Sequence, residues 1–206
     1  MAVTLPATAP PDQVISTSFV EEFQDVPALY TKGWISETLI PSYGIDWVQG
    51  VPPTSDKSGN IYGFPAYSYY AGKDEYILAG DNTDSSFSSW LITPIMSVRN
   101  GDKISFYAYG DDDRRCRLQV LMSQSEPFSI GDTLNSTGNF SVLLNIPAQD
   151  AGSFPAVWTK YDYTFSGISG NMKTRIAFRH YTGGQSYAGG QVGGIGIDQF
   201  KFEVSK

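Results

Sequence analysis

Apolar and polar residues alternate in three segments of the chain, and this alternation is typical of half-buried β-strands. The segments are residues 104–109, 117–122 and 175–180. Shorter or less regular alternation predicts further strands at residues 18–24, 75–79, 90–98, 139–146, 158–165 and 197–204. The stretches between them are rich in Gly, Pro, Ser, Asn and Asp, and no long amphipathic helix or internal repeat is evident. The pattern therefore predicts an all-β fold, a β-sandwich whose longest loops are residues 41–72 and 182–196.

Two details of the alternation carry specific expectations. The polar turn at residues 110–114 separates the first two segments, which predicts an antiparallel hairpin over residues 103–123. The only histidine, His180, has the phase of Ile176 and Phe178, so its imidazole is expected to point into the sandwich.

One acidic residue near each end of the chain is in phase with apolar neighbours. Glu21 has the phase of Phe19 and Phe23, and Asp198 has the phase of Phe200. Both carboxylates are therefore expected to point inward, where an uncompensated charge is costly.

A calcium ion that joins the first strand to the last would satisfy both acids, because calcium prefers carboxylate and carbonyl oxygens. Its predicted ligands are Glu21, Asp198 and Asp46, completed by backbone carbonyls of the loop after Asp46. The alternatives are ion pairs with Arg175 or Arg179, or a β-bulge that turns Asp198 outward. A bulge is suggested by the isoleucines just before Asp198, which have the opposite phase.

Composition and charge narrow the class of protein. A chain of 206 residues is most simply one domain, here residues 14–206, after a Pro-rich tail or linker at residues 1–13. The net charge of −7 argues against nucleic acid and anionic membranes as partners. No apolar run is long enough to span a membrane, and Cys116, the only cysteine, is expected to be a structural thiol.

Several short motifs occur in a fixed order over residues 18–204. They are Glu21-Glu22-Phe23, Gly33-Trp34, Asp46-Trp47, Ser89-Trp90-Leu91-Ile92-Thr93-Pro94, Ile176-Ala177-Phe178-Arg179-His180-Tyr181 and Gly193-Gly194-Ile195-Gly196-Ile197-Asp198. In this order they resemble the choice-of-anchor J and cleaved-adhesin domains, found largely in exported proteins of Bacteroidetes. The resemblance implies a jelly-roll β-sandwich, similar to carbohydrate-binding modules and the MAM domain, with structural calcium. It also implies an extracellular or cell-surface location, with the export signal removed from this sequence. The loop before Trp47 is shorter than is usual in that family, which weakens the case for a calcium ligand there.

Aromatic residues crowd two predicted loops, and a sugar site needs exposed aromatic rings flanked by polar side chains. The candidate ligand-binding residues are Trp47, Tyr62, Tyr67, Tyr69 and Tyr187, and Tyr181 also borders the glycine-rich loop. The competing interpretation is that most of these rings pack beneath the long loops. Burial in the core is also what we expect of Trp34, Trp90 and Trp158.

The chain carries little sign of catalysis. A buried His180 is a poor general base, and no strand carries the alternating carboxylates of a jelly-roll glycosidase. We therefore expect a non-catalytic, exported module for adhesion or carbohydrate binding, with a glycan or a host or cell-surface protein as partner. The alternatives are a structural or protein-interaction domain of a larger surface protein, without a small ligand, and a glycan hydrolase with its site in residues 41–72.

Overall fold

The computed structural model describes residues 13–39, 47–50, 54–55, 61–62, 76–79, 87–110, 117–123, 125–147, 154–181 and 194–206 of the chain. For residues 54–55, 61–62 and 76–79 only the backbone is described. No helix in these parts of the chain has the length and apolar character needed to cross a bilayer.

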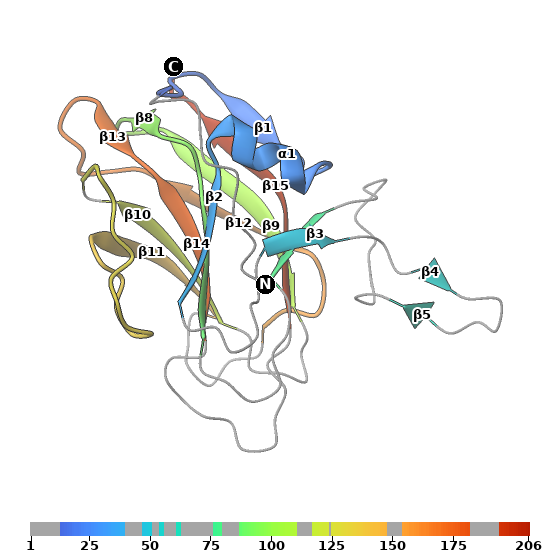
Figure 1. Cartoon of the computed structure of the whole chain (residues 1–206). Helices are drawn as coiled ribbons and strands as arrows, with labels where there is room; N and C mark the ends of the chain where they lie inside the picture. Colours follow the sequence, from blue (N-terminus) through green and yellow to red (C-terminus); the bar gives the residue numbers. More distant parts are fainter. Residues whose placement is uncertain are drawn as a thin grey trace.

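Two antiparallel sheets stack face to face, as Figure 1 shows. The six-stranded sheet has the order β12 (Thr159–Thr164), β9 (Lys103–Gly110), β15 (Ile195–Glu203), β6 (Tyr76–Ala79) and β3 (Trp47–Gly50), with β1 (Phe19–Glu21) also paired to β15. The five-stranded sheet has the order β11 (Phe140–Ile146), β10 (Leu118–Ser123), β14 (Ile176–Tyr181), β7 (Ser88–Ile92) and β2 (Ile35–Leu39). Two small ribbons pair β13 (Met172–Thr174) with β8 (Met96–Val98), and β4 (Thr54–Ser55) with β5 (Ile61–Tyr62). The fold is therefore the expected all-β, jelly-roll sandwich.

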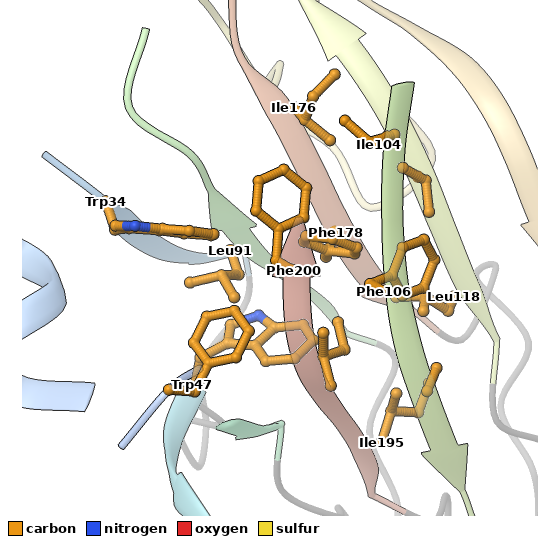
Figure 2. Packing of buried hydrophobic residues seen from close by; sticks show 14 of the residues in the cluster. Trp34, Trp47, Leu91, Ile104, Phe106, Leu118, Ile176, Phe178, Ile195 and Phe200 are labelled. Carbon is orange, nitrogen blue, oxygen red and sulfur yellow. The ribbon is translucent and has the colours of Figure 1, made fainter. Parts of the chain in front are cut away.

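The main hydrophobic core lies between the two sheets (Figure 2). Phe106 of β9 meets Phe178 of β14 edge to face, with ring centroids 4.9 Å apart, and Phe178 meets Phe200 of β15 at 5.8 Å. These contacts join the two sheets through apolar residues whose alternation in the sequence predicted the strands. Trp34 and Trp90 are buried as expected, whereas Trp158 is only half-buried.

A second, smaller core covers the outer face of the five-stranded sheet. Trp90, Leu121 and Ala177 point away from the main core and pack under the segment of residues 125–139 through Ile130. The five-stranded sheet is thus buried on both faces over part of its area, which explains why Ser88–Ile92 is buried at every position.

Helix α1 (Val26–Leu29) and the 3₁₀ turn η1 (Tyr30–Lys32) connect β1 to β2. Asp25 caps α1 by accepting a hydrogen bond from the Ala28 amide at 3.1 Å. Gly33 follows the turn with a φ of 88°, a left-handed conformation that glycine adopts without steric cost.

The prediction of a hairpin over residues 103–123 is wrong. β9 pairs with β12 and β15 in one sheet, and β10 pairs with β11 and β14 in the other. A polar turn indicates only that a strand ends there. Which strands then pair is decided by how the apolar face of each strand is buried in the folded protein. The strand expected at residues 90–98 is likewise divided at Thr93–Ile95 into β7 and β8, which belong to different sheets.

Candidate functional site

Strand β15 contains a β-bulge at the position of the predicted metal ligand. Asp198 pairs with Tyr107 of β9, and Lys201 pairs with Ser105, so three steps along β15 match two along β9. Gln199 supplies the extra residue and has a φ of 50°, in the left-handed region. The bulge exchanges the two faces of β15, so Ile197 before it and Phe200 after it both reach the core.

The expectation that Asp198 points into the sandwich with Phe200 is wrong because of this bulge. Asp198 lies on the side of Tyr107, whereas its neighbour Ile197 pairs with Ala108 of the core. Its side chain is nevertheless only 2% exposed, and one carboxylate oxygen accepts a hydrogen bond from the Gln199 amide at 2.7 Å. The bulge alternative is therefore correct, although the outward-facing acid remains buried.

Glu21 is held by a lysine. Its Oε2 lies 3.0 Å from Nζ of Lys32, and its Oε1 accepts a hydrogen bond from the Phe23 amide at 3.2 Å. The side chain of Glu21 is 12% exposed. Arg175, one of the alternative partners, instead pairs with Glu126 at 3.2 Å. Sequence reasoning missed Lys32 because the 3₁₀ turn, which brings it back to β1, has no hydrophobic pattern.

The three predicted calcium ligands differ in how well they fit a cation. Asp198 fits best, since a buried carboxylate favours a nearby positive charge. Glu21 fits less well, because a metal ion would have to displace the Lys32 ammonium. Asp46 lies outside the described residues, within which no three His, Cys, Asp or Glu side chains gather into a metal site. Calcium therefore stays a prediction.

Among the five candidate sugar-binding aromatic residues, the structure describes only one side chain, that of Trp47. Trp47 is 1% exposed and belongs to the main core, so it cannot serve as an exposed platform. Tyr67, Tyr69 and Tyr187 lie outside the described residues, and of Tyr62 only the backbone is described, in β5.

The outer face of the five-stranded sheet holds a buried arginine beside Tyr181. Arg179 is 2% exposed, and its Nε donates to Ser88 Oγ and its Nη1 to Gln119 Oε1, each at 2.8 Å. Its Nη2 donates to the carbonyl of Leu134. The guanidinium lies 4.4 Å from the ring centroid of Tyr181 and 5.2 Å from that of Trp90. Burial lowers the pKa of Arg179 to about 10, so it stays charged at neutral pH, and no carboxylate of the described residues pairs with it.

Strand pairing places two further polar side chains beside Arg179, in a row that leads to the surface. Arg179, Gln119 and Asn145 lie opposite one another on β14, β10 and β11. Gln119 donates from Nε2 to Asn145 Oδ1 at 3.0 Å. Asn145 is exposed, and Tyr181 and Gln119 are half-buried. We refer to Tyr181, Arg179, Gln119 and Asn145 as the outer-face row. Of its members, sequence reasoning singled out only Tyr181 as a binding candidate, because the others become neighbours through strand pairing.

His180 points into the sandwich, as predicted. It is fully buried against Phe87, with ring centroids 4.8 Å apart, and among the described residues neither ring nitrogen has a hydrogen-bond partner. Burial lowers its pKa to about 3. A neutral imidazole without a hydrogen-bonded partner cannot activate a nucleophile, so the described residues form no Ser-His-Asp arrangement around His180.

No protein-family model and no curated protein sequence matches this chain. Among solved structures, it is similar to the K1 cleaved adhesin domain of Lys-gingipain from Porphyromonas gingivalis W83, at 16% identity and a TM-score of 0.55, over 93% of this chain and 100% of that domain. The K2 cleaved adhesin domain of Lys-gingipain has 16% identity and a TM-score of 0.54, over 91% of this chain and 100% of that domain. A carbohydrate-binding module in complex with beta-1,4-galactotriose has 12% identity over 90% of this chain and 99% of its own, with a TM-score of 0.47, too low to support an inference. The resemblance to cleaved-adhesin domains is thus supported at the level of the fold.

Proposed function

We propose that this protein is an exported, non-catalytic module that binds carbohydrate at a cell surface through the outer-face row. The observation that carries the proposal is the position of Tyr181, half-buried and stacked 4.4 Å from the Arg179 guanidinium, next to two side-chain amides. A sugar presents an apolar face ringed by hydroxyl groups, and this row supplies an aromatic surface with amide donors and acceptors beside it.

The row is also held in place before any ligand arrives. Arg179 fixes Tyr181 by stacking and fixes Gln119 by a hydrogen bond, and Gln119 in turn fixes Asn145. Side chains that are already ordered lose little conformational entropy on binding, which favours affinity.

The adhesive role and the cell-surface location have separate support. The two cleaved adhesin domains match this chain over their full length, so the likeness extends to the complete domain. We propose on this basis that the chain is a cleaved-adhesin or choice-of-anchor J module whose partner is a glycan, with a host or cell-surface protein as the alternative partner.

We also propose a structural calcium ion near the bulge of β15. Asp198 is its best-placed ligand among the described residues, and Glu21, Asp46 and loop carbonyls are its further predicted ligands. Such an ion would be coordinated by the buried carboxylate and would hold the last strand to a second segment of the chain.

A glycan array with the purified chain tests the carbohydrate proposal, followed by titration of the best ligand against three variants of the row. We expect Asn145→Ala to weaken binding by roughly two- to tenfold, the effect of one lost hydrogen bond. Tyr181→Leu should weaken it more than Tyr181→Phe, because Phe keeps the aromatic surface. Asn171→Ala, which changes an exposed asparagine outside the row, is the matched control. Equal affinity in all variants would place the glycan elsewhere, and the absence of any glycan ligand would favour a protein partner.

A further inference from the structure

The inner face of the five-stranded sheet becomes polar toward one end. Along β14 and β7 the core residues Phe178 and Leu91 are followed by His180 and Ser89, which pair with each other. Thr38 of β2 pairs with Ser89 and extends the polar row to the sheet edge. Ser36 also lies on this face, because it pairs with Leu91. We call Ser36, Thr38, Ser89 and His180 the inner polar patch.

Part of this patch is buried and has no hydrogen-bond partner in the part of the chain that the structure describes. Ser89 and Thr38 satisfy each other, with their hydroxyl oxygens 3.2 Å apart. In contrast, no described residue forms a hydrogen bond with Ser36 Oγ or with either ring nitrogen of His180. Native proteins rarely leave buried polar atoms unsatisfied, and those that remain commonly contact a water molecule or a ligand.

The facing sheet contributes a further unsatisfied donor. Nε1 of Trp47 in β3 is buried, and none of the described residues accepts a hydrogen bond from it. Strand β3 lies against β7, and Figure 2 shows Trp47 near Leu91, which is the register partner of Ser36. The inner faces of both sheets therefore carry polar atoms that have no partner within the described part of the chain, and those of Trp47 and Ser36 lie on strands that each contact β7.

The chemistry of this region selects an uncharged ligand. Arg179 and Glu37, the nearest charged residues along β14 and β2, lie on the opposite face of the sheet with Trp90. Because burial lowers the pKa of His180 to about 3, its imidazole is neutral and offers one donor and one acceptor. Ser36 can donate and accept, and Trp47 can only donate. Arg179 and Glu37 are the only charged residues of β2, β3, β7 and β14, so the described strands around this region offer neither a cation to an anion nor a carboxylate to a metal ion.

We propose that the interior of the sandwich at the inner polar patch binds neutral hydroxyl groups, which accept from Trp47 Nε1 and exchange hydrogen bonds with Ser36 and His180. Two sources share this chemistry, namely internal water and the hydroxyls of a small sugar or polyol. The inference does not depend on carbohydrate binding at the outer-face row, because the two groups lie on opposite faces of the sheet.

Nuclear magnetic resonance of the full chain, labelled with ¹⁵N, tests the proposal at the atoms concerned. The indole signal of Trp47 is assigned by its loss in Trp47→Phe, and the chain is titrated with galactose, glycerol and, as a charged comparator, glucuronate. If sugar or polyol is the occupant, the Trp47 indole and His180 ring signals shift to saturation with galactose or glycerol and do not shift with glucuronate. If water is the occupant, the indole proton shows cross-relaxation with water and no shift with any of the three compounds. An indole proton with neither response would overturn the proposal, because the region would then be dry.

A measurement of thermal stability tests the proposal independently. If the hydroxyl of Ser36 has a bound partner, Ser36→Ala lowers the melting temperature more than Ser141→Ala, which changes an exposed serine of β11. If the region is dry, Ser36→Ala removes an unsatisfied buried group and raises the melting temperature relative to that control, which contradicts the proposal.

Discussion

Asp198 of β15 lies opposite Tyr107 of β9 on the outer side of the six-stranded sheet, and is nevertheless buried. This relationship follows from the bulge at Gln199, which exchanges the two faces of the last strand. It also coincides with a change of partner at the other edge of β15, since β6 pairs with Ile195–Ile197 and β1 pairs with Phe200–Phe202. The bulge therefore marks the point where two separate strands share one edge.

The backbone at the bulge makes a prediction about residue 199. A left-handed φ costs a residue with a side chain about 1 kcal/mol relative to glycine, and Gln199 has a φ of 50°. We expect Gln199→Gly to be more stable than Gln199→Ala by about 1 kcal/mol, as measured by urea unfolding. The alanine variant is the control, because both substitutions remove the same side-chain contacts. Equal stability of the two variants would mean that the left-handed conformation is not strained.

The calcium proposal predicts a thermal shift that depends on Asp198. In excess Ca²⁺ the melting temperature should rise above its value in chelator, because a ligand that binds only the folded state stabilises it by about 2.7 kcal/mol at 100 times its dissociation constant. Asp198→Asn should remove this shift, whereas Asp162→Asn, a change of an exposed carboxylate in β12, should keep it. An identical melting temperature of the parent in both media would lead us to withdraw the calcium proposal.

His180 makes stability depend on pH. Its pKa is about 3 in the folded state, against about 6.5 in the unfolded chain. Below pH 6.5 the unfolded chain therefore binds a proton that the folded protein excludes, and stability falls until the pH approaches 3. We expect a loss of about 2 kcal/mol between pH 7 and pH 5 from this group, measured by urea unfolding. His180→Phe should have a flatter profile over this range, and a profile parallel to that of the parent would show that His180 is not the group responsible.

Arg179 is predicted to be a stabilising residue that lysine cannot replace. Its guanidinium donates to Ser88, Gln119 and Leu134 while stacking on Trp90 and Tyr181. Lysine lacks the planar group that makes these contacts together, so Arg179→Lys should cost about 2–4 kcal/mol of unfolding free energy.

The matched control for that substitution is Arg99→Lys. Arg99 is exposed and lies 3.6 Å from Asp102, so the same change should cost less than about 1 kcal/mol. Similar losses in both variants would indicate a general preference for arginine rather than the specific contacts of Arg179.

The strands with clear alternation were predictable from the sequence, and so was the burial of His180. β9, β10 and β14 each bury alternate residues in the main core, as the phase of their apolar residues indicates. β2 and β3 escaped prediction. Their inward positions include Ser36, Thr38 and Gln49, polar residues that interrupt the pattern on which strand prediction depends.

The contacts within the candidate sites were harder to predict from the sequence. Lys32 reaches Glu21 only because α1 and η1 reverse the chain, and Arg179 meets Gln119 only because β14 pairs with β10. Trp47, expected from its place in a loop motif to be a binding residue, is buried because β3 adds to the edge of the six-stranded sheet.

The sequence by itself determined the all-β class and the inward face of each regular strand, because alternation of side chains is a local property with a period of two residues. Only the tertiary structure decided which strands pair, where the bulge reverses the faces of β15, and which polar side chains meet across strands. These outcomes depend on burial and hydrogen bonding between segments distant in the chain, and no local pattern records them.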